Sequence, residues 1–235
     1  MSRFLKNIAK IGITLGAGYG AYVAACYIHD NPPVPKASSD KPKIACVGDS
    51  ITYGSGVPFN RMQDSYPALL QGFFKNRYQV LNYGLPNRTL CTCGDHPYVL
   101  EKMYLATLRV KADKYIIMLG SNDSKPYNFN ADKYEEELMQ LLNTYIDIAG
   151  ADNVYVCLPP DIFPDRLTGM IKYDISALNL NDIRMIIKDV AAKLHVTCVD
   201  LYENTIDHPE YYMDGIHPNA MGNKVIAHKL YEVIK

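Results

Sequence analysis

Five short apolar runs alternate with longer amphipathic segments from residue 43 to the end of the chain. The runs are KIACVG, QVLNYG, KYIIMLG, NVYVCLP and VTCVDL, at residues 43–48, 79–84, 114–120, 153–159 and 196–201. Near-continuous aliphatic and β-branched runs are typical of strands covered on both faces, and therefore of a parallel sheet. The alternation predicts a three-layer α/β/α sandwich with a central five-stranded parallel sheet, wound by right-handed crossovers.

The segments between these runs carry apolar residues at helical spacing. We predict helices over residues 66–75, 98–110, 131–149, 178–194 and 218–234. The last helix is expected to have Pro218 in its first turn, where a proline removes no helical hydrogen bond.

In such sheets the ligand site lies beyond the carboxyl ends of the strands. Four segments fall at or just after these ends, at residues 48–50, 84, 120–123 and 158–160. We therefore expect residues that are distant in the sequence to meet at one edge of the sheet.

Ser50, in VGDSITYG, is a candidate nucleophile at that edge. A serine hydroxyl is a weak nucleophile, so it needs a base to take its proton and donors to bind the oxyanion that forms. The alternative interpretation is structural, because Gly-Asp-Ser is also common in ordinary turns.

Three groups could bind the oxyanion. The backbone N–H of Ser50 would face the reacting carbonyl, and Gly84 ends the next strand, where a glycine lets the backbone approach a ligand closely. Asn122 carries an amide donor that needs no particular protonation state, although Asn122 and Asp123 could instead cap a helix.

The segment YYMDGIHPNAMG supplies a candidate base, His217, three residues after a carboxylate, Asp214. Asp214 can bind the Nδ1–H of the imidazole and leave Nε2 free to accept a proton. His208, beside Asp207, is the rival candidate.

The four blocks GDSIT (48–52), NYG with Gly84, GSND (120–123) and DGIHP (214–218) together resemble those of the SGNH, or GDSL, hydrolase superfamily. The resemblance runs from about residue 43 to the C-terminus and implies the flavodoxin-like fold of that superfamily. It also implies a catalytic triad of Ser50, Asp214 and His217, with Ser50, Gly84 and Asn122 as the oxyanion hole.

Three further segments, DSYPALL, LGSNDSKPYN and CLPPDIF, are similar to a bacterial subgroup of carbohydrate O-acetylesterases. That subgroup usually has a second glycine where this chain has Asn87, a residue that tolerates left-handed backbone. As substrate-binding residues we consider Asp49, Tyr53, Asn87 and Tyr127, although these tyrosines could equally be core or surface residues.

The composition excludes some classes of function. The 235 residues carry a formal net charge of -1, which does not favour nucleic acid as a partner because phosphate binding needs clustered Lys and Arg. Cys91 and Cys93 form a CxC without a second ligand pair, which is a poor metal site, and Cys46, Cys157 and Cys198 lie in strand-like runs. We expect neither a metal nor a cofactor.

The N-terminus predicts export. Cations precede residues 11–28, which carry no charge, so residues 1–28 are expected to be an export signal or a membrane anchor. The segment VAAC resembles a lipobox that would lipidate Cys26; the alternatives are a retained signal-anchor helix and a buried soluble helix. Residues 29–42 are then predicted to be a flexible linker and residues 43–235 the hydrolase domain, held outside the cytoplasm.

Together these features predict a serine esterase that hydrolyses short acyl esters, acetyl above all, on carbohydrate. A lipid acyl hydrolase (lysophospholipase or thioesterase) with the same triad, and a non-catalytic glycan-binding module, are the alternatives. Transfer of the acyl group to a sugar instead of water also stays open.

Overall fold

The computed structural model describes residues 31–38 and 40–235. By internal contacts the chain divides into residues 1–33 and residues 34–235. The predicted export signal or anchor, with Cys26, lies outside the described residues. Within the described part, no helix combines the length and apolar character needed to cross a bilayer.

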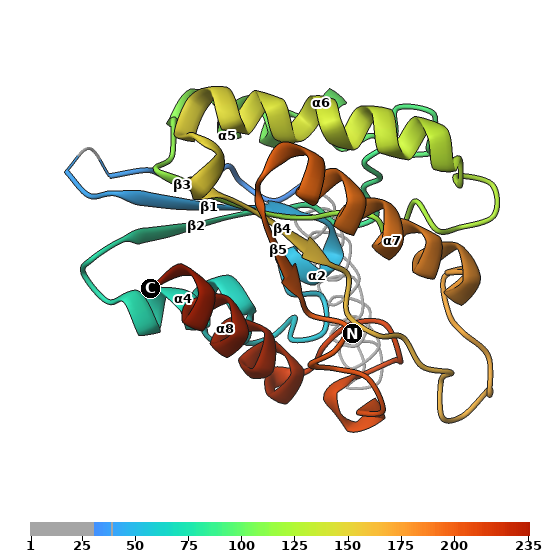
Figure 1. Ribbon diagram of the computed structural model, residues 1–235. Coiled ribbons are helices and arrows are strands. Elements are labelled where there is room, and N and C mark those ends of the chain that lie inside the picture. Colours follow the sequence, from blue (N-terminus) through green and yellow to red (C-terminus); the bar gives the residue numbers. More distant parts are fainter. Residues whose placement is uncertain (1–30, 39) are drawn as a thin grey trace, which may run out of the picture. The chain divides into compact units, whose positions relative to one another are not determined.

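A five-stranded parallel sheet with the order β2-β1-β3-β4-β5 forms the centre of the domain (Figure 1). Its strands are β1 (Lys43–Gly48), β2 (Gln79–Gly84), β3 (Lys114–Met118), β4 (Val154–Leu158) and β5 (Thr197–Asp200). The predicted five-stranded parallel sheet is thereby confirmed. The register pairs Gly48 with both Gly84 and Met118, so the carboxyl ends of β1, β2 and β3 coincide at one edge.

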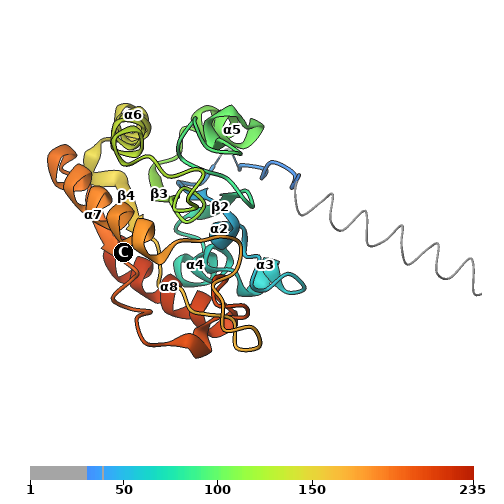
Figure 2. The same cartoon turned by 90° about the vertical axis from the view of Figure 1, so that its right-hand side faces the viewer.

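Helices cover both faces of the sheet, which confirms the predicted three-layer fold (Figures 1 and 2). One face packs against α5 (Lys102–Val110), α6 (Ala131–Ala149) and α7 (Ala177–Leu194). The other packs against α2 (Ser50–Tyr53), α4 (Tyr66–Phe74) and α8 (Ala220–Ile234). The remaining short elements are α3 (Arg61–Asp64), η1 (Tyr98–Leu100), η2 (Ala151–Asn153) and η3 (Pro209–Tyr211).

Successive residues of each strand point to opposite faces, and both faces are buried. In β1, Ala45 and Val47 join the core under α5, α6 and α7, whereas Ile44 and Cys46 join the core under α4 and α8. This burial on both sides explains why the strands are continuous apolar runs in the sequence.

Two helices begin differently from the prediction. Pro218 precedes α8 instead of lying in its first turn: Asn219 is the N-cap, and its side chain accepts the N–H groups of Met221 and Gly222. The helix predicted from residue 98 is interrupted at Glu101, whose backbone is extended (φ -94°, ψ 151°) and whose carboxylate binds Arg88.

Part of the segment predicted as a linker lies against the domain. The Gln79 side chain, at the start of β2, accepts the Ser38 N–H at 2.6 Å and donates to the Lys36 carbonyl at 3.0 Å. These two bonds attach the chain to the edge strand before β1 begins.

Candidate active site

Ser50 is the first residue of α2, the single helical turn that follows β1. The turn begins because the Asp49 carboxylate accepts the Ile51 N–H at 2.9 Å, and it ends at Gly54 in left-handed conformation. The N–H of a first helical residue has no carbonyl partner within its own helix. The local fold thus presents both the hydroxyl and the backbone N–H of Ser50 at the carboxyl edge of the sheet.

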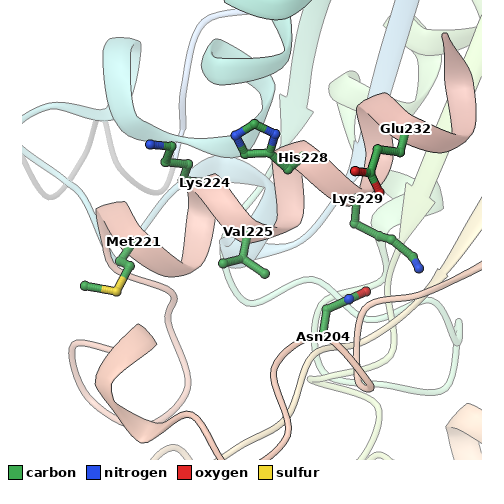
Figure 3. Close-up of a pocket in the computed structure, with 7 residues that line it drawn as sticks. All are labelled: Asn204, Met221, Lys224, Val225, His228, Lys229 and Glu232. Carbon is green, nitrogen blue, oxygen red and sulfur yellow. The ribbon is translucent and has the colours of Figure 1, made fainter.

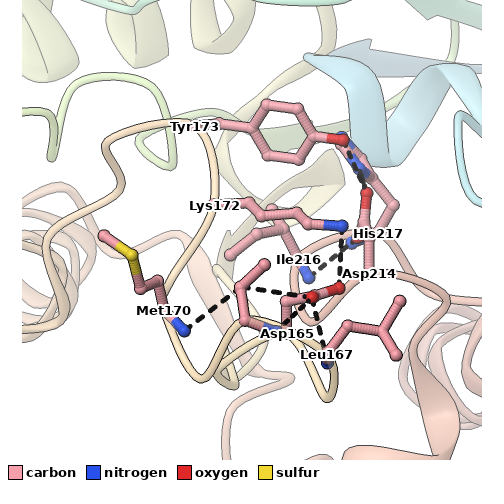
Figure 4. A network of polar contacts seen from close by, with 9 residues as sticks. Asp165, Leu167, Met170, Lys172, Tyr173, Asp214, Ile216 and His217 are labelled. Atoms are coloured by element: carbon pink, nitrogen blue, oxygen red, sulfur yellow. Dashed lines mark hydrogen bonds and ion pairs between the residues drawn. The ribbon is translucent and has the colours of Figure 1, made fainter.

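Asp214 and His217 lie in the turn that precedes α8. The Oδ1 atom of Asp214 accepts the N–H groups of Ile216 at 3.0 Å and His217 at 2.8 Å, which fixes the carboxylate against the backbone. Its Oδ2 atom lies 2.8 Å from His217 Nδ1 (Figure 4). On the other side of the ring, His217 Nε2 lies 3.0 Å from Ser50 Oγ.

The charge of Asp214 sets the tautomer of the histidine. Burial opposes ionisation of this carboxyl group, but its bonds with His217 and the two backbone N–H groups outweigh burial and hold its pKa well below the usual range. An ionised Asp214 is a pure acceptor, so His217 carries its proton on Nδ1 and offers Nε2 to the serine hydroxyl. The arrangement can therefore remove a proton from Ser50.

Asn122 follows β3 and is buried. Its Nδ2 group donates to the Arg88 backbone carbonyl at 3.2 Å, and the backbone carbonyl of Asn122 accepts from the Asn128 side-chain amide at 3.0 Å. A side-chain amide has two N–H donors, so the bond to Arg88 uses one and orients the other.

Gly84 differs from the expectation for an oxyanion donor. Its N–H donates to the Asn82 Oδ1 atom at 2.9 Å. A Cβ atom at this position would lie 2.1 Å from the Tyr53 backbone nitrogen, so the end of β2 packs directly on α2. The structure explains the glycine by this close approach, and its oxyanion role stays a prediction.

The four residues considered for substrate binding lie in different settings. Asp49 is fully buried and holds α2, and burial raises its pKa to about 6. Tyr53 is buried, with the Arg61 guanidinium 4.2 Å from its ring centre. Asn87 has φ 66°, the left-handed backbone expected of it, and Tyr127 is exposed.

His208, the rival base, does not approach Ser50. Its side chain is exposed on the surface, stacks on Tyr211 at 4.5 Å and has Nδ1 2.7 Å from Glu210. Of the two candidate bases, only His217 is placed at the serine.

Sequence reasoning missed Tyr173. Its hydroxyl donates to Asp214 Oδ2 at 2.9 Å, and its ring meets the His217 ring edge-on at 5.3 Å. A tyrosine in a loop 41 residues before the aspartate gives no local signal of this contact.

The described cysteines are free thiols, and Cys91 is buried while Cys93 is exposed. Over the described part of the chain, no three His, Cys, Asp or Glu side chains gather as a metal site would require.

A separate cavity of about 370 Å³ lies along α8 (Figure 3). It is lined by Asn204, Met221, Lys224, Val225, His228, Lys229 and Glu232, none of which belongs to the Ser50–His217–Asp214 group. His228, its only imidazole, packs against Phe73 at 4.6 Å between ring centres.

Comparison with known proteins finds relatives in sequence and in fold. An acetylxylan esterase of Xylanibacter ruminicola is 32% identical over 216 residues, which make up 86% of this chain and 45% of the relative. The chain thus spans about half the length of that curated relative.

Solved structures share the fold at lower identity. Est24, a carbohydrate acetylesterase from Sinorhizobium meliloti, superposes with a TM-score of 0.64 at 22% identity, covering 82% of this chain and 97% of Est24. An acetyl xylan esterase superposes with a TM-score of 0.65 at 20% identity, covering 82% of this chain and 100% of that one.

The strongest assignment comes from the sequence model of the GDSL-like lipase/acylhydrolase family, which matches residues 46–225. This range includes Ser50, Asn122, Asp214 and His217. The chain belongs to the GDSL-like lipase/acylhydrolase family.

Proposed function

We propose that the protein is a serine esterase whose triad is Ser50, His217 and Asp214. The observation that carries the proposal is the unbroken chain of contacts from Ser50 Oγ to His217 Nε2 at 3.0 Å and from His217 Nδ1 to Asp214 Oδ2 at 2.8 Å. A non-catalytic binding module would not need a buried carboxylate, an oriented imidazole and a serine in this order.

The reaction proceeds through an acyl-enzyme. Ser50 Oγ attacks the ester carbonyl while His217 Nε2 takes the hydroxyl proton, and the Ser50 N–H and the Asn122 amide stabilise the oxyanion. His217 then protonates the leaving alcohol, and the acyl group remains on Ser50. A water molecule, deprotonated by His217, finally releases the acid and restores the serine.

The Gly84 N–H can join the oxyanion hole only if it leaves or shares its bond with Asn82. We keep it as a third donor in the proposal for the state with substrate bound. For the resting state the proposal relies on the Ser50 N–H and on the second N–H of the Asn122 amide.

Short acyl groups on carbohydrate are the substrate class we propose. Support comes from the acetylxylan esterase of Xylanibacter ruminicola, which is 32% identical, and from Est24, a carbohydrate acetylesterase that shares the fold. Neither metal nor cofactor has a part in this chemistry.

A lipid acyl hydrolase is the second candidate, favoured by one observation. Leu167 and Met170, on the loop that leads to Tyr173, are 95% and 69% exposed. This loop lies beside the turn of residues 214–217, which we call the triad turn (Figure 4). Exposed apolar side chains at this place could contact an acyl chain.

Labelling with a fluorophosphonate probe, combined with a series of p-nitrophenyl esters from acetyl to octanoyl, tests the proposal. We expect the wild-type protein to be labelled and Ser50→Ala not to be, with acetyl the fastest ester. Faster turnover of octanoyl would favour the lipid hydrolase, and absence of both labelling and turnover would contradict a serine esterase. Acetate release from acetylated xylan, with and without an added sugar acceptor, then separates hydrolysis from transfer.

We also propose that the domain works outside the cytoplasm. The support is the sequence of residues 1–28 alone. Fractionation of cells that express wild type and Cys26→Ala tests the mode of attachment: release of the variant from the membrane supports lipidation, and retention supports a signal anchor. Recovery of the wild-type protein in the cytoplasm would contradict the proposed location.

A further inference from the structure

We propose that Tyr173 is a positioning residue of the triad, which holds the Asp214 carboxylate in place for His217. The inference rests on the proposed function, because it assigns a part to Tyr173 in the same reaction. It starts from the contacts of the carboxylate.

Each carboxylate oxygen of Asp214 accepts hydrogen bonds from two donor groups (Figure 4). Oδ1 accepts the backbone N–H groups of Ile216 and His217. Oδ2 accepts the His217 ring at 2.8 Å and the Tyr173 hydroxyl at 2.9 Å. Among the described residues, the tyrosine is therefore the one side chain besides the histidine itself that donates to the oxygen facing the ring.

The tyrosine also contacts the histidine directly. The two rings meet edge-on, with their centres 5.3 Å apart and their planes at 67°. One side chain thus limits both the rotation of the carboxylate and the tilt of the imidazole.

A backbone hydrogen bond and apolar contacts attach the loop that carries Tyr173 to the triad turn. The Phe163 N–H donates to the Gly215 carbonyl at 2.8 Å, and Ile175 packs in a small apolar cluster with Leu180 and Ile216. Gly215 and Ile216 lie between Asp214 and His217. The loop and the triad turn therefore form one packed unit.

A second set of bonds holds the loop to itself. Asp165 Oδ1 accepts the N–H groups of Leu167 and Thr168, and Asp165 Oδ2 lies 2.7 Å from Lys172 Nζ (Figure 4). The ion pair directly precedes Tyr173 and limits the positions that the tyrosine can reach.

The backbone at the tyrosine is unusual. Tyr173 has φ 61° and Asp174 φ 57°, so two successive non-glycine residues adopt left-handed conformation. Such backbone is unfavourable and persists where surrounding interactions over-determine it. Here the Tyr173 hydroxyl and ring supply those interactions through Asp214 and His217.

The Tyr173 hydroxyl remains a donor over the working range of pH. Burial and the adjacent Asp214 raise the pKa of Tyr173 to about 12. The negative charge of Asp214 stabilises the protonated imidazolium form of His217. The neutral Tyr173 hydroxyl weakens this effect because its hydrogen bond to Oδ2 offsets part of that charge. Removal of the hydroxyl should therefore favour protonated His217 and leave less of the neutral base at acidic pH.

The other ionisable groups near the pair are Asp49, the N-cap of α2, whose charge interacts with that of His217, and Lys172 and Asp165 in the loop. A Tyr173→Phe substitution leaves all three in place and keeps the aromatic ring. Any change it causes in the pH profile can be assigned to the hydroxyl.

The test compares Tyr173→Phe with two controls. Thr168→Val removes a hydroxyl that bonds Asp165 Oδ1 at 3.2 Å, so it loosens the loop without changing a charge or the tyrosine. Tyr104→Phe removes a phenol hydroxyl from α5, a helix that carries no residue of the proposed triad. The kcat/KM profile is measured against pH on p-nitrophenyl acetate, and the His217 ring-proton signals are followed by NMR over the same range.

We expect Tyr173→Phe to lower kcat/KM about 3–10-fold, the effect of one hydrogen bond, and to move the acid limb and the ring titration to higher pH. The two controls should leave both titrations unchanged. Superposition of the Tyr173→Phe titrations on those of wild type would overturn the inference. So would an equal shift in Thr168→Val, because loop order alone would then explain it.

The NMR titration separates this inference from the proposed function. If the wild-type protein hydrolyses no ester, the esterase proposal fails, yet the effect of the hydroxyl on His217 is still measured. If the wild-type enzyme is active and the tyrosine variant is unchanged, only the positioning role fails.

Discussion

His217 Nε2 lies 3.0 Å from Ser50 Oγ, although the two residues are 167 positions apart in the sequence. The segment after α2 contributes to this contact, since a Cβ atom at Gly56 would lie 2.1 Å from the Pro218 carbonyl oxygen. The glycine lets the chain that follows the serine lie directly on the backbone that follows the histidine. The approach of two chain segments, not a local motif, thus sets the distance between nucleophile and base.

Replacement of the nucleophile should abolish most activity without unfolding the protein. Ser50→Ala is expected to lower kcat by on the order of 10⁴–10⁶ because no acyl-enzyme can form. The check is turnover of p-nitrophenyl acetate, with thermal unfolding as the control for the fold. Wild-type turnover by a purified, folded variant would show that Ser50 is an ordinary loop residue.

Asn122→Ala should lower kcat by about 10²–10³-fold through loss of one oxyanion donor, with a smaller effect on KM. The amide also bonds the Arg88 carbonyl, so some loss of order is expected in the loop that contains Asn87. Measuring kcat and KM separately distinguishes the two effects. A rise in KM at unchanged kcat would speak against an oxyanion role.

Gly84 and Gly72 form a matched pair for testing the packing of β2 on α2. A methyl group at Gly84 would meet the Tyr53 nitrogen at 2.1 Å, whereas one at Gly72, inside α4, meets nothing within 4 Å. We expect Gly84→Ala to destabilise the fold strongly and Gly72→Ala to stabilise it by about 0.5–1 kcal/mol, the helical advantage of alanine.

Urea unfolding of both variants and the wild type checks this prediction. The Gly84→Ala protein is expected to unfold at the lowest urea concentration or to fail to accumulate. Equal stability of the two variants would mean that β2 and α2 can separate without cost.

Two buried carboxyl groups should make stability depend on pH. Burial raises the pKa of Asp49 from 3.8 to about 6 and that of Asp123 from 3.8 to about 7. A raised folded-state pKa contributes stability that is complete below the unfolded value and is lost as pH rises through the folded value. Both groups therefore predict that the free energy of unfolding falls between about pH 4 and pH 8.

Asp49→Asn isolates one of these groups, because asparagine keeps an oxygen to accept the Ile51 N–H. Relative to wild type, this variant should gain on the order of 1–2 kcal/mol of stability on going from pH 5 to pH 8. Urea unfolding at the two pH values measures the difference. A stability difference that does not change with pH would show that Asp49 is not neutral in the folded protein at pH 5.

Much of the fold could be predicted from local signals. Residues 131–149 are helical as predicted, because Asn130 caps the start through the Lys133 N–H and Gly150 ends the helix in a backbone unfavourable to other residues. The strands lie within two residues of the predicted runs because burial on both faces leaves a continuous apolar signature. The predicted start of α8 at Pro218 was wrong. Pro218 and Asn219 both suit a helix start, and only the hydrogen bonds made by the Asn219 side chain show that the helix begins after Asn219.

The sequence by itself determined the order of strands and helices, the family, and the residues able to act as nucleophile, base and carboxylate, because periodicity and short motifs are local properties. The family resemblance already favoured His217 over His208 as the base. The tertiary structure alone decided that its Nε2 atom lies 3.0 Å from Ser50 Oγ, that the Gly84 N–H is bound to Asn82, and that Tyr173 contacts Asp214. These contacts join residues through loops whose path depends on packing against distant elements. A distance of a few ångströms between such residues is a property of the whole fold, which no window of sequence contains.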